Sequence, residues 1–446
     1  MSNGTPPWTR HRFDAVGQMG DGNFDVIVIG AGYTGLYCAY RLARQGQSVC
    51  VLERDTIVGA ASSRNAGFCT VSPPVAVDQL FGEGREIAQA WVDWYASAVD
   101  NCEDVAATVA SFAPDPIGFR RVGNARLAET HKQTAALARQ QEAYAALGHT
   151  RHLVAAPAID LPDDGQFKAA LVDRQSARLN PGALHLALAQ AAVAAGVVVC
   201  QSRPARDISV LDGQVQISLH GQEDRLTSRK VIVATNGFTN TTVAPFEQFL
   251  LSIGSFVIVS EPISDDKTLG WLATGQCHAT SYRFPHYFRL LDDRRLLFGG
   301  RAGLSTQTDL AACKAWLLGR AQRLFPAVNF DGAQTCWGGR LGFAVDKRPL
   351  LGRLDDKIYY AMGCAGHGVP TTLAMARDLT DHMLGNRRQL APFWREPDRP
   401  PTVIPKLVRR SLPIAQSGLR MLDLIDRLRD RVPVTRPAVP SQWRDA

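Results

Sequence analysis

Three glycines at a fixed spacing, Gly30, Gly32 and Gly35, are the residues of this sequence that most directly indicate chemistry. They form a G-x-G-x-x-G pattern, in which the first glycine permits a tight turn and the second lets the backbone approach a pyrophosphate. The third lets a helix pack closely on a strand. Glu53 follows at the distance where a carboxylate holds the ribose hydroxyls of a dinucleotide. The four residues together predict a dinucleotide site.

The elements that must position these groups can be read on either side of the glycines. Residues 24–29 are a short apolar run of the kind that forms a buried parallel strand. A helix is expected over residues 34–45, with its N-terminal N–H groups and dipole facing the phosphates. Residues 48–52 are expected to form the second strand. A glycine-rich turn that binds nothing explains neither this spacing nor the acid at its end.

Three further segments carry small or polar residues suited to a ligand. In residues 59–68, GAASSRNAGF, the small residues let backbone lie close to a ligand, and the polar ones offer hydrogen bonds; the alternative is a flexible polar loop. The strand expected at residues 231–234 ends in a small-residue turn, Thr235-Asn236-Gly237, near the carboxyl edge of the sheet. A second glycine-rich turn, residues 363–368, opens a helix near Pro370 whose N-terminus could stabilise negative charge.

Composition limits the classes of protein to consider. The length of 446 residues suits two interleaved domains. The net charge is +7, but the basic residues are spread out until the C-terminal tail, which argues against a nucleic-acid partner. The nine cysteines occur singly, as expected of reduced thiols, and the ten histidines lack metal-ligand spacing. With neither a signal peptide nor a bilayer-spanning run, the sequence predicts a cytoplasmic protein without a metal site.

The periodicity of the sequence changes along the chain and predicts two domains. Residues 77–146 are mainly helical in pattern, with a short hairpin expected at 118–128, and another helix is expected over 306–325. From Phe246 to Gly303 the period becomes two, and the segments 255–262 and 282–300 are predicted as antiparallel strands. In the second of these, Tyr287 and Arg289 share one face. We expect a first domain of residues 24–75, 165–245 and 335–385, and a substrate or cap domain of residues 76–164 and 246–334.

The last segment, residues 386–446, is a basic, proline-rich extension. Within it, residues 406–431 form a potential amphipathic helix whose apolar stripe consists of Leu419, Leu422, Leu424, Ile425 and Leu428. We expect this helix to dock on the body of the protein in preference to lying on a membrane surface, because such stripes more often pack in a core.

These motifs, in this order, resemble the D-amino acid oxidase superfamily of flavoproteins over roughly residues 24–385. Within that superfamily the sequence is most similar to the gamma-glutamylputrescine oxidoreductase branch, through GAGYTGL at residues 30–36, GAASSRNAGF and the basic extension. The resemblance implies FAD, bound non-covalently. Cys336 and Cys364 stand where a covalent flavin link would be conceivable, but a small buried residue is the preferred interpretation. The implied fold is α/β (α+β overall), with a Rossmann-like FAD domain and a mainly antiparallel substrate domain of the glycine/sarcosine-oxidase kind.

The resemblance also assigns cofactor contacts residue by residue. The glycine turn holds the pyrophosphate, Glu53 the adenosine ribose, and the backbone of Ala205 the adenine. The polar loop passes the pyrophosphate and flavin, and the late turn sits at the pyrimidine end of the ring. The full set of expected cofactor-binding residues is Gly30, Gly32, Tyr33, Thr34, Gly35, Glu53, Arg54, Ser62, Ser63, Arg64, Asn65, Ala66, Gly67, Ala205, Thr235, Asn236, Gly237, Gly363, Gly366, His367, Gly368 and Val369.

Two departures from the family pattern concern the substrate. Glycine and D-amino acid oxidases commonly carry an arginine four residues after the tryptophan of a W-x-G segment, where it clamps the substrate carboxylate. Counted from Trp337, that position is Leu341, and a second arginine position in the late turn is Gly366. An apolar side chain cannot replace an arginine fork. The clamp is therefore missing or rebuilt, by Arg289 or by Arg340, which favours an amine or an amino acid whose carboxylate is held elsewhere.

The predicted reaction is oxidation of a C–N bond to an imine by hydride transfer to the flavin, followed by hydrolysis to an aldehyde or ketone. The candidate catalytic or substrate-side residues are His367, Tyr287, Arg289 and Trp337, each with a structural alternative: a turn histidine, a packed strand face, a buried tryptophan. The expected partners are a small-molecule amine or amino acid and oxygen or another electron acceptor.

Alternative functions remain open. They are a membrane-associated dehydrogenase that passes electrons to a quinone chain, a cyclic imino acid oxidase of the pipecolate or proline kind, and a non-catalytic FAD-binding protein. An NAD dehydrogenase is disfavoured by the polar loop and the late glycine turn.

Overall fold

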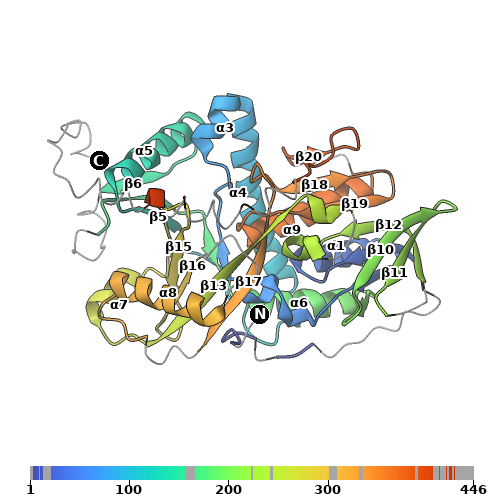
Figure 1. Ribbon diagram of the computed structural model, residues 1–446, viewed down its shortest axis with the longest axis horizontal. Helices are drawn as coiled ribbons and strands as arrows, with labels where there is room; N and C mark the ends of the chain where they lie inside the picture. The colour runs from blue at the N-terminus through green and yellow to red at the C-terminus, as the bar shows by residue number, and fades with distance from the viewer. Residues whose placement is uncertain are drawn as a thin grey trace.

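The structure is a computed structural model that describes residues 4–9, 11–13, 22–155, 166–221, 225–241, 245–300, 309–330, 335–386 and 390–404, and the helical positions 411, 418, 421–423 and 426. Two large sheets, with helices packed on them, make up most of the molecule (Figure 1). A short third sheet joins β3 (Phe68–Cys69), β8 (Ala177–Arg178) and β4 (Arg120–Arg121). The described residues thus form a mixed α/β fold with a parallel and an antiparallel part.

The first sheet has the order β20–β18–β19–β12–β1–β2–β9. Its parallel strands are β1 (Asn23–Ile29), β2 (Val49–Leu52), β9 (Val198–Cys200), β12 (Arg225–Val233) and β19 (Ile358–Met362). At its edge, β18 (Leu350–Arg353) runs antiparallel to β19 and parallel to β20 (Trp394–Arg395). The hairpin of β10 (Ala205–Leu211) and β11 (Gln214–Leu219) is attached to β12.

Strand β1 shows why this sheet is buried on both faces. Val26 and Val28 belong to the core on the helical face, whereas Ile27 and Ile29 belong to the core under the β10–β11 hairpin. All four side chains are 3% exposed or less. An unbroken apolar run is what a strand covered on both sides requires, and the strand predicted at residues 24–29 is present.

Helices α1 (Tyr33–Ala43), α6 (Pro181–Ala194), α9 (Gly368–Met383) and α4 (Arg85–Thr108) cover the helical face, with α1 packed between α6 and α9, and α4 packed on α9. Helix α6 starts where its sequence predicts, because the side chain of Asn180 accepts a hydrogen bond from the N–H of Ala183 (3.1 Å) and Pro181 occupies the first turn.

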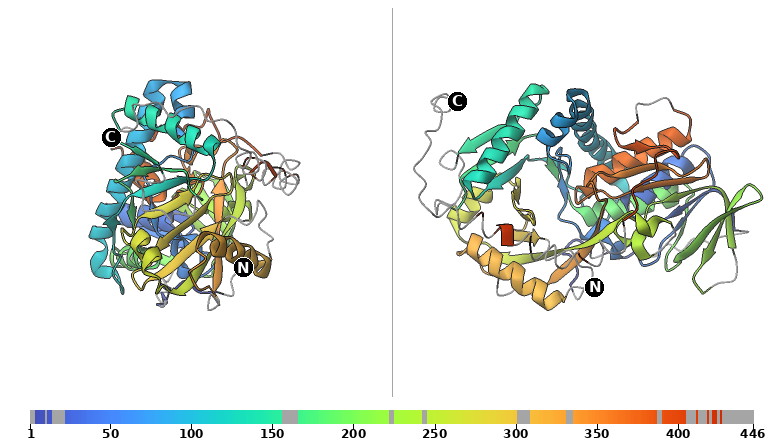
Figure 2. Two further views of the ribbon diagram at one scale, coloured as in Figure 1. Left: turned by 90° about the vertical axis from the view of Figure 1, so that its left-hand side faces the viewer. Right: turned by 45° about the horizontal axis from the view of Figure 1, so that its top comes forward.

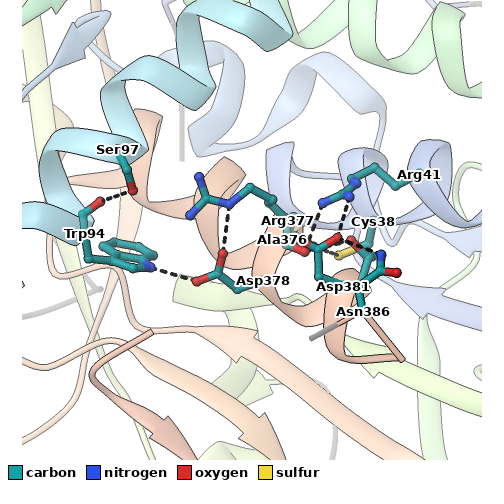
Figure 3. A network of polar contacts seen from close by, with 10 residues as sticks. Cys38, Arg41, Trp94, Ser97, Ala376, Arg377, Asp378, Asp381 and Asn386 are labelled. Carbon is teal, nitrogen blue, oxygen red and sulfur yellow. Dashed lines mark hydrogen bonds and ion pairs between the residues drawn. The ribbon is translucent and has the colours of Figure 1, made fainter. Parts of the chain in front are cut away.

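A buried polar network ties α1, α4 and α9 together (Figure 3). The indole N–H of Trp94 and the Nε of Arg377 donate to the two carboxylate oxygens of Asp378, at 2.7 and 2.8 Å. One turn further, the guanidinium of Arg41 donates to Asp381 (2.7 Å). Asp378 is 2% exposed, so its charge depends on these two donors. The network fixes α9, whose N-terminus faces the site described below.

The second sheet has the order β17–β13–β16–β15–β14–β5–β7–β6 and is antiparallel except between β14 and β5. Its strands are β17 (Cys336–Phe343), β13 (Leu251–Pro262), β16 (Arg295–Gly300), β15 (His286–Leu290), β14 (Cys277–Thr280), β5 (Asn124–Ala128), β7 (Ala169–Asp173) and β6 (His152–Ala155).

Alternation along β13 assigns the two faces of this sheet. Phe256 and Ile258 pack with α8 (Leu310–Leu324) and α7 (Asp266–Leu272). Val257 and Val259 lie on the other face, in a cluster that includes Ala66 of the first domain. The right-hand view of Figure 2 shows the yellow-orange α7 and α8 at the end of the molecule away from the blue α1. The second sheet therefore turns its uncovered face towards the first domain.

The structure corrects several predicted boundaries. Strands β7 and β17 lie within segments assigned to the first domain but pair in the second sheet, and α4 lies in the predicted cap domain but packs on α9. The hairpin expected at residues 118–128 is absent among the described pairings, since β4 pairs with β8 and β5 pairs with β7 and β14. Two further helices, α3 (Val77–Glu83) and α5 (His131–Ala146), confirm the helical pattern of that region.

Two acidic residues of the C-terminal extension are held by ion pairs. Asp423 and Asp426 pair with Arg283 at 2.7 and 3.2 Å, and Asp426 also pairs with Lys132. Leu422 is 46% exposed. The other four residues of the predicted apolar stripe, and the start of the helix predicted at residues 306–325, lie outside the described residues. In the part of the chain that is described, no helix has both the length and the apolarity needed to span a bilayer.

Replacing Asp378 by Ala is expected to lower the free energy of unfolding by about 3 kcal/mol or more, because it leaves a buried guanidinium and a buried indole N–H without an acceptor. Urea denaturation measures the change. Asp100→Ala is the matched control, since Asp100 pairs with Arg121 at 2.7 Å but is 65% exposed, and a loss of at most about 1 kcal/mol is expected. Equal losses in the two variants would contradict the role given to this network.

Candidate active site

The glycine turn between β1 and α1 has no room for side chains at two of its glycines. Gly30 has φ +105°, in the region that favours glycine, and a Cβ on Gly35 would overlap the carbonyl oxygen of Gly30. Gly32 faces a cavity of about 80 Å³ at the carboxyl end of the sheet. Thr34 and Gly35 are buried in α1 and do not line this cavity.

Glu53 follows β2 and lies beside the glycine turn. Its carboxylate accepts from the backbone N–H of Ala31 (2.8 Å) and of Asp55 (2.9 Å). Burial raises the pKa of Glu53, against the opposing effect of these two hydrogen bonds. The acid thus joins the ends of β1 and β2 and lines the first cavity, together with the predicted residues Arg54, Ala205, Thr235, Asn236 and Gly237.

Two arginines flank an aromatic ring in this first cavity. The guanidinium carbons of Arg54 and Arg340 lie 4.6 and 5.2 Å from the ring centroid of Phe238. Burial lowers the pKa of Arg340, and the charge of Arg54 adds to that effect. Arg340 was one of two predicted substitutes for the missing carboxylate clamp. The structure places it with the glycine turn instead, where positive charge suits a pyrophosphate.

The polar loop is built on α2 (Ala61–Arg64) and reaches both domains. Ser62 Oγ accepts from the backbone N–H of Tyr33 (3.0 Å). Arg64 donates to the carbonyl oxygens of Gly338 (2.8 Å) and Gly4 (3.0 Å). Ser62, Arg64, Asn65 and Ala66 line a second cavity, of about 360 Å³. Ser63 and Gly67 do not: Ser63 is fully buried, and Gly67 packs on the carbonyl group of Leu179.

The late glycine turn forms the opposite wall of the second cavity. Its N–H at Gly363 donates to the side chain of Asn236 (2.9 Å), which ties the turn to the end of β12. His367 stands at the N-cap of α9 without a capping side chain. The residues of this wall are Cys364, Ala365, Gly366, His367, Gly368 and Val369. The backbone N–H groups of the first turn of α9 therefore face the cavity.

The second sheet closes the cavity on its remaining side. Tyr287 lies over Gly299, whose Cβ would overlap the tyrosine ring, and its hydroxyl is 3.0 Å from Ser255 Oγ. Leu341 and Phe343 of β17 line the same wall. The position of the expected clamp is thus inside the cavity and apolar.

Two of the four candidate catalytic residues lie outside this cavity. Arg289 is 3% exposed and donates to the carbonyl oxygens of Ala66 (2.8 Å) and Leu179 (3.2 Å). Burial lowers its pKa to about 10. Trp337 is fully buried and donates its indole N–H to the carbonyl of Arg64 (2.9 Å). Both residues hold the polar loop and neither lines the second cavity, which corrects their predicted roles; Tyr287 and His367 line it.

Comparison with known proteins agrees with this geometry. The family model described as "FAD dependent oxidoreductase" (DAO) matches residues 25–382. The chain belongs to this family. A gamma-glutamylputrescine oxidoreductase of Escherichia coli is 27% identical over 91% of this chain and 93% of its own. A probable oxidoreductase OrdL of Haemophilus influenzae is 26% identical over 83% and 85%.

Solved structures of the same fold include a glycine oxidase from Geobacillus kaustophilus, with a TM-score of 0.70 at 18% identity, covering 84% of this chain and 98% of that one. An L-proline dehydrogenase from P. horikoshii has a TM-score of 0.68 at 16% identity, with 83% and 96% covered. The predicted superfamily, the FAD-dependent oxidoreductase activity, the FAD cofactor and the two-part fold are therefore confirmed.

The residues present in this member of the DAO family fit FAD. The two cavities share Ala61, Ser62 and Asn236, so they form one elongated site. The first contains the glycine cradle, the carboxylate of Glu53 and two guanidinium groups, which suit the ribose and pyrophosphate. The second lies at the N-terminus of α9, which suits the ring system. No group of three or more potential metal-ligating side chains was found among the described residues.

Sequence reasoning did not identify many of the residues that line the second cavity. The residues that it did not single out include Asn124, Arg126, Ser255, Tyr282, Arg283, Phe343 and Lys347. It also missed His185 of α6, whose Nε2 lies 2.7 Å from the carbonyl oxygen of Ala31 in the glycine turn. For Arg126 a signal exists: in β5 it is a polar residue among small and apolar ones. For His185 the only signal is a histidine inside an apolar helix, which core packing explains equally well.

Replacing Glu53 by Ala is expected to weaken FAD binding by about 10- to 100-fold, because each lost charged hydrogen bond contributes about 1.5–3 kcal/mol. Flavin content after purification and the dissociation constant from fluorescence titration measure the effect. Asp100→Ala serves as a control with unchanged affinity. A Glu53→Ala protein with full flavin content would overturn the assignment of Glu53 as the ribose anchor.

His185 makes the glycine turn sensitive to acid. Burial lowers its pKa from 6.5 to about 4, so between these values the unfolded chain binds a proton that the folded chain does not. The free energy of unfolding should therefore fall as the pH drops through this window, by up to about 3 kcal/mol from this residue. A His185→Gln variant keeps a donor for Ala31 and should show a shallower decline in urea denaturation at pH 4–7. Identical slopes for the variant and the parent protein would refute this.

Proposed function

We propose that this flavoenzyme oxidises a C–N bond of an amine, or of an amino acid whose carboxylate lies away from the flavin. The observation that carries the proposal is Leu341, which occupies the clamp position and lines the second cavity. An apolar side chain there offers nothing to an α-carboxylate. The uncharged carbon chain next to an amine nitrogen, in contrast, fits a wall of Leu341, Phe343 and Tyr287.

The charges around the cavity support the same substrate. The described residues that line it include no Asp or Glu, whereas Arg64, Arg126 and Lys347 do line it. Arg283 also lines it, but its charge is paired with Asp423 and Asp426. An ammonium group would meet net positive charge, so the free amine is the form that binds. This is also the form whose nitrogen lone pair can assist loss of a hydride from the adjacent carbon. The name of the E. coli relative, an oxidoreductase for an acylated diamine, agrees with an amine substrate.

Bound FAD supplies a two-electron acceptor for the hydride, and the imine product then hydrolyses to an aldehyde or ketone. The protein's part is to bind, orient and exclude water. The N-terminus of α9, which begins after the N-cap residue His367, places backbone N–H groups and a positive dipole end where negative charge develops. The hydroxyl pair of Tyr287 and Ser255 offers the substrate amine an acceptor. Arg289 and Trp337 keep the polar loop in place.

Anaerobic mixing with polyamines, their acylated forms, cyclic imino acids and D-amino acids tests the proposal through loss of flavin absorbance. Rapid bleaching by amines is expected, and bleaching by simple D-amino acids alone would overturn it. In Leu341→Arg, the KM for small α-amino acids should fall by about tenfold or more, since a new guanidinium can pair with the α-carboxylate. Leu341→Met is the control and should retain the amine preference.

The electron acceptor is a separate question with its own measurement. Peroxide release measured beside dye and quinone reduction distinguishes an oxidase from a dehydrogenase. Turnover with dye but without peroxide would exclude oxygen as the acceptor while leaving C–N oxidation intact.

A further inference from the structure

Arg126 of the strand β5 lines the second cavity. Strand pairing places it in one row with Ala279 of β14 and Tyr287 of β15, because Arg126 is paired with Ala279 and Ala279 with Tyr287. Residues paired in this way share one face of a sheet. Arg126 and Tyr287 are thus two strands, or about 10 Å, apart at their backbones.

The strand that lies between these two side chains contributes little bulk to the space that separates them. Ala279 stands between them and lines the cavity with only a methyl group. The ring of Tyr287 lies over Gly299, on the side away from Arg126. Asn124, two residues before Arg126 and therefore on the same face, also lines the cavity and is 7% exposed. The row forms a trough with an amide and a guanidinium at its far end.

The guanidinium of Arg126 makes no hydrogen bond or ion pair with any side chain or backbone group that the structure describes. The nearest ion pairs of its charged neighbours are with other residues. Arg151 lies 3.6 Å from Asp173 and 3.7 Å from the ring centroid of Tyr144. Asp78, the acid that acts on Arg126 from α3, lies 3.7 Å from Arg139. Burial is the main reason why the pKa of Arg126 is lowered.

The other cations of the cavity wall differ from Arg126. Arg283 is neutralised by Asp423 and Asp426. Arg64 is held by two backbone carbonyls, and Lys347 is exposed to solvent. A half-buried guanidinium that lacks these contacts and lines the cavity is a ready partner for an anion that enters it. A carboxylate fits its planar fork with two parallel hydrogen bonds.

We infer that Arg126, with Asn124 beside it, binds a carboxylate at the far end of the substrate, so that the enzyme acts on amines that carry a carboxylate several bonds from the reacting C–N bond. This inference rests on the proposed amine oxidation and specifies its substrate class. In this protein the arginine that binds a carboxylate would lie on β5, and the clamp position of the family, on β17, is occupied by Leu341.

The test compares two acylated diamines that differ in one group, N-succinylputrescine and N-butyrylputrescine. The first ends in a carboxylate and the second in a methyl group at the same position. The parent protein should have a KM about 10- to 100-fold lower for the succinyl compound. In Arg126→Met this preference should disappear through a higher KM for the succinyl compound, with the rate of flavin reduction at saturation and the KM for the butyryl compound nearly unchanged.

Two further variants control for charge and for folding. Arg126→Lys keeps the positive charge and should restore part of the preference for the succinyl compound. Arg295→Met removes an arginine that pairs with Asp293 in the β15–β16 hairpin and should leave the preference intact. Flavin content and thermal melting show whether each variant is folded. A parent protein without preference, or an equal loss for both compounds in Arg126→Met, would overturn the inference.

Binding without turnover separates this inference from the proposed function. N-succinylbutylamine retains the carboxylate but has no amine to oxidise, and calorimetry on the flavin-loaded protein measures its affinity. A dissociation constant that rises about tenfold or more in Arg126→Met supports the anion site. It does so even if no amine of the panel reduces the flavin, because the lack of flavin reduction would reject only the proposed function. If the protein oxidises amines but the parent and Arg126→Met have the same dissociation constant for N-succinylbutylamine, only the anion site is rejected.

Discussion

The backbone of the polar loop, residues 59–68, is the constraint on which both halves of the site depend. Buried donors of the second sheet reach its carbonyl oxygens, through the guanidinium of Arg289 and the indole N–H of Trp337. Arg64 returns the contact by donating to a carbonyl of β17, and Ser62 accepts from the first turn of α1. Because a buried polar group left without a partner costs about 1–3 kcal/mol, these contacts hold the two sheets in one relative position. The cofactor cavity and the substrate cavity are therefore aligned by a single segment.

The local parts of the site could be predicted from the sequence, and the parts that depend on distant contacts could not. The turn at Gly30, the crossing at Gly35 and the acid at Glu53 belong to one βαβ unit, so their spacing encodes their geometry. Arg289 and Tyr287 share a face as the two-residue period predicts. Yet the loop carbonyl that covers Arg289 comes from Ala66, 223 residues away. Periodicity assigns a face of a strand but not the segment that covers it.

The same limit explains the misplaced boundaries. Strands β7 and β17 have apolar patterns that suit either sheet, and only pairing with partners far along the chain decides which sheet they join. Helix α4 buries Trp91 and Trp94 against α9. The same apolar stripe could equally have packed against a cap domain. Fold class, in contrast, was predictable, because the βαβ unit at residues 24–53 and the two-residue period from Phe246 to Gly303 are each recognisable on their own.

The position of a carboxylate clamp determines how long a substrate must be. An α-carboxylate is one bond from the carbon that loses the hydride, so an arginine that binds it must stand beside the flavin, as at the position of Leu341. A guanidinium on β5 lies two strands beyond Tyr287, and only a molecule with well-separated ends can reach both. Arg126 is partly buried when the chain folds, so a carboxylate finds its partner already in place on the strand. Moving one charge along the sheet thus changes the substrate class while the cofactor site stays the same.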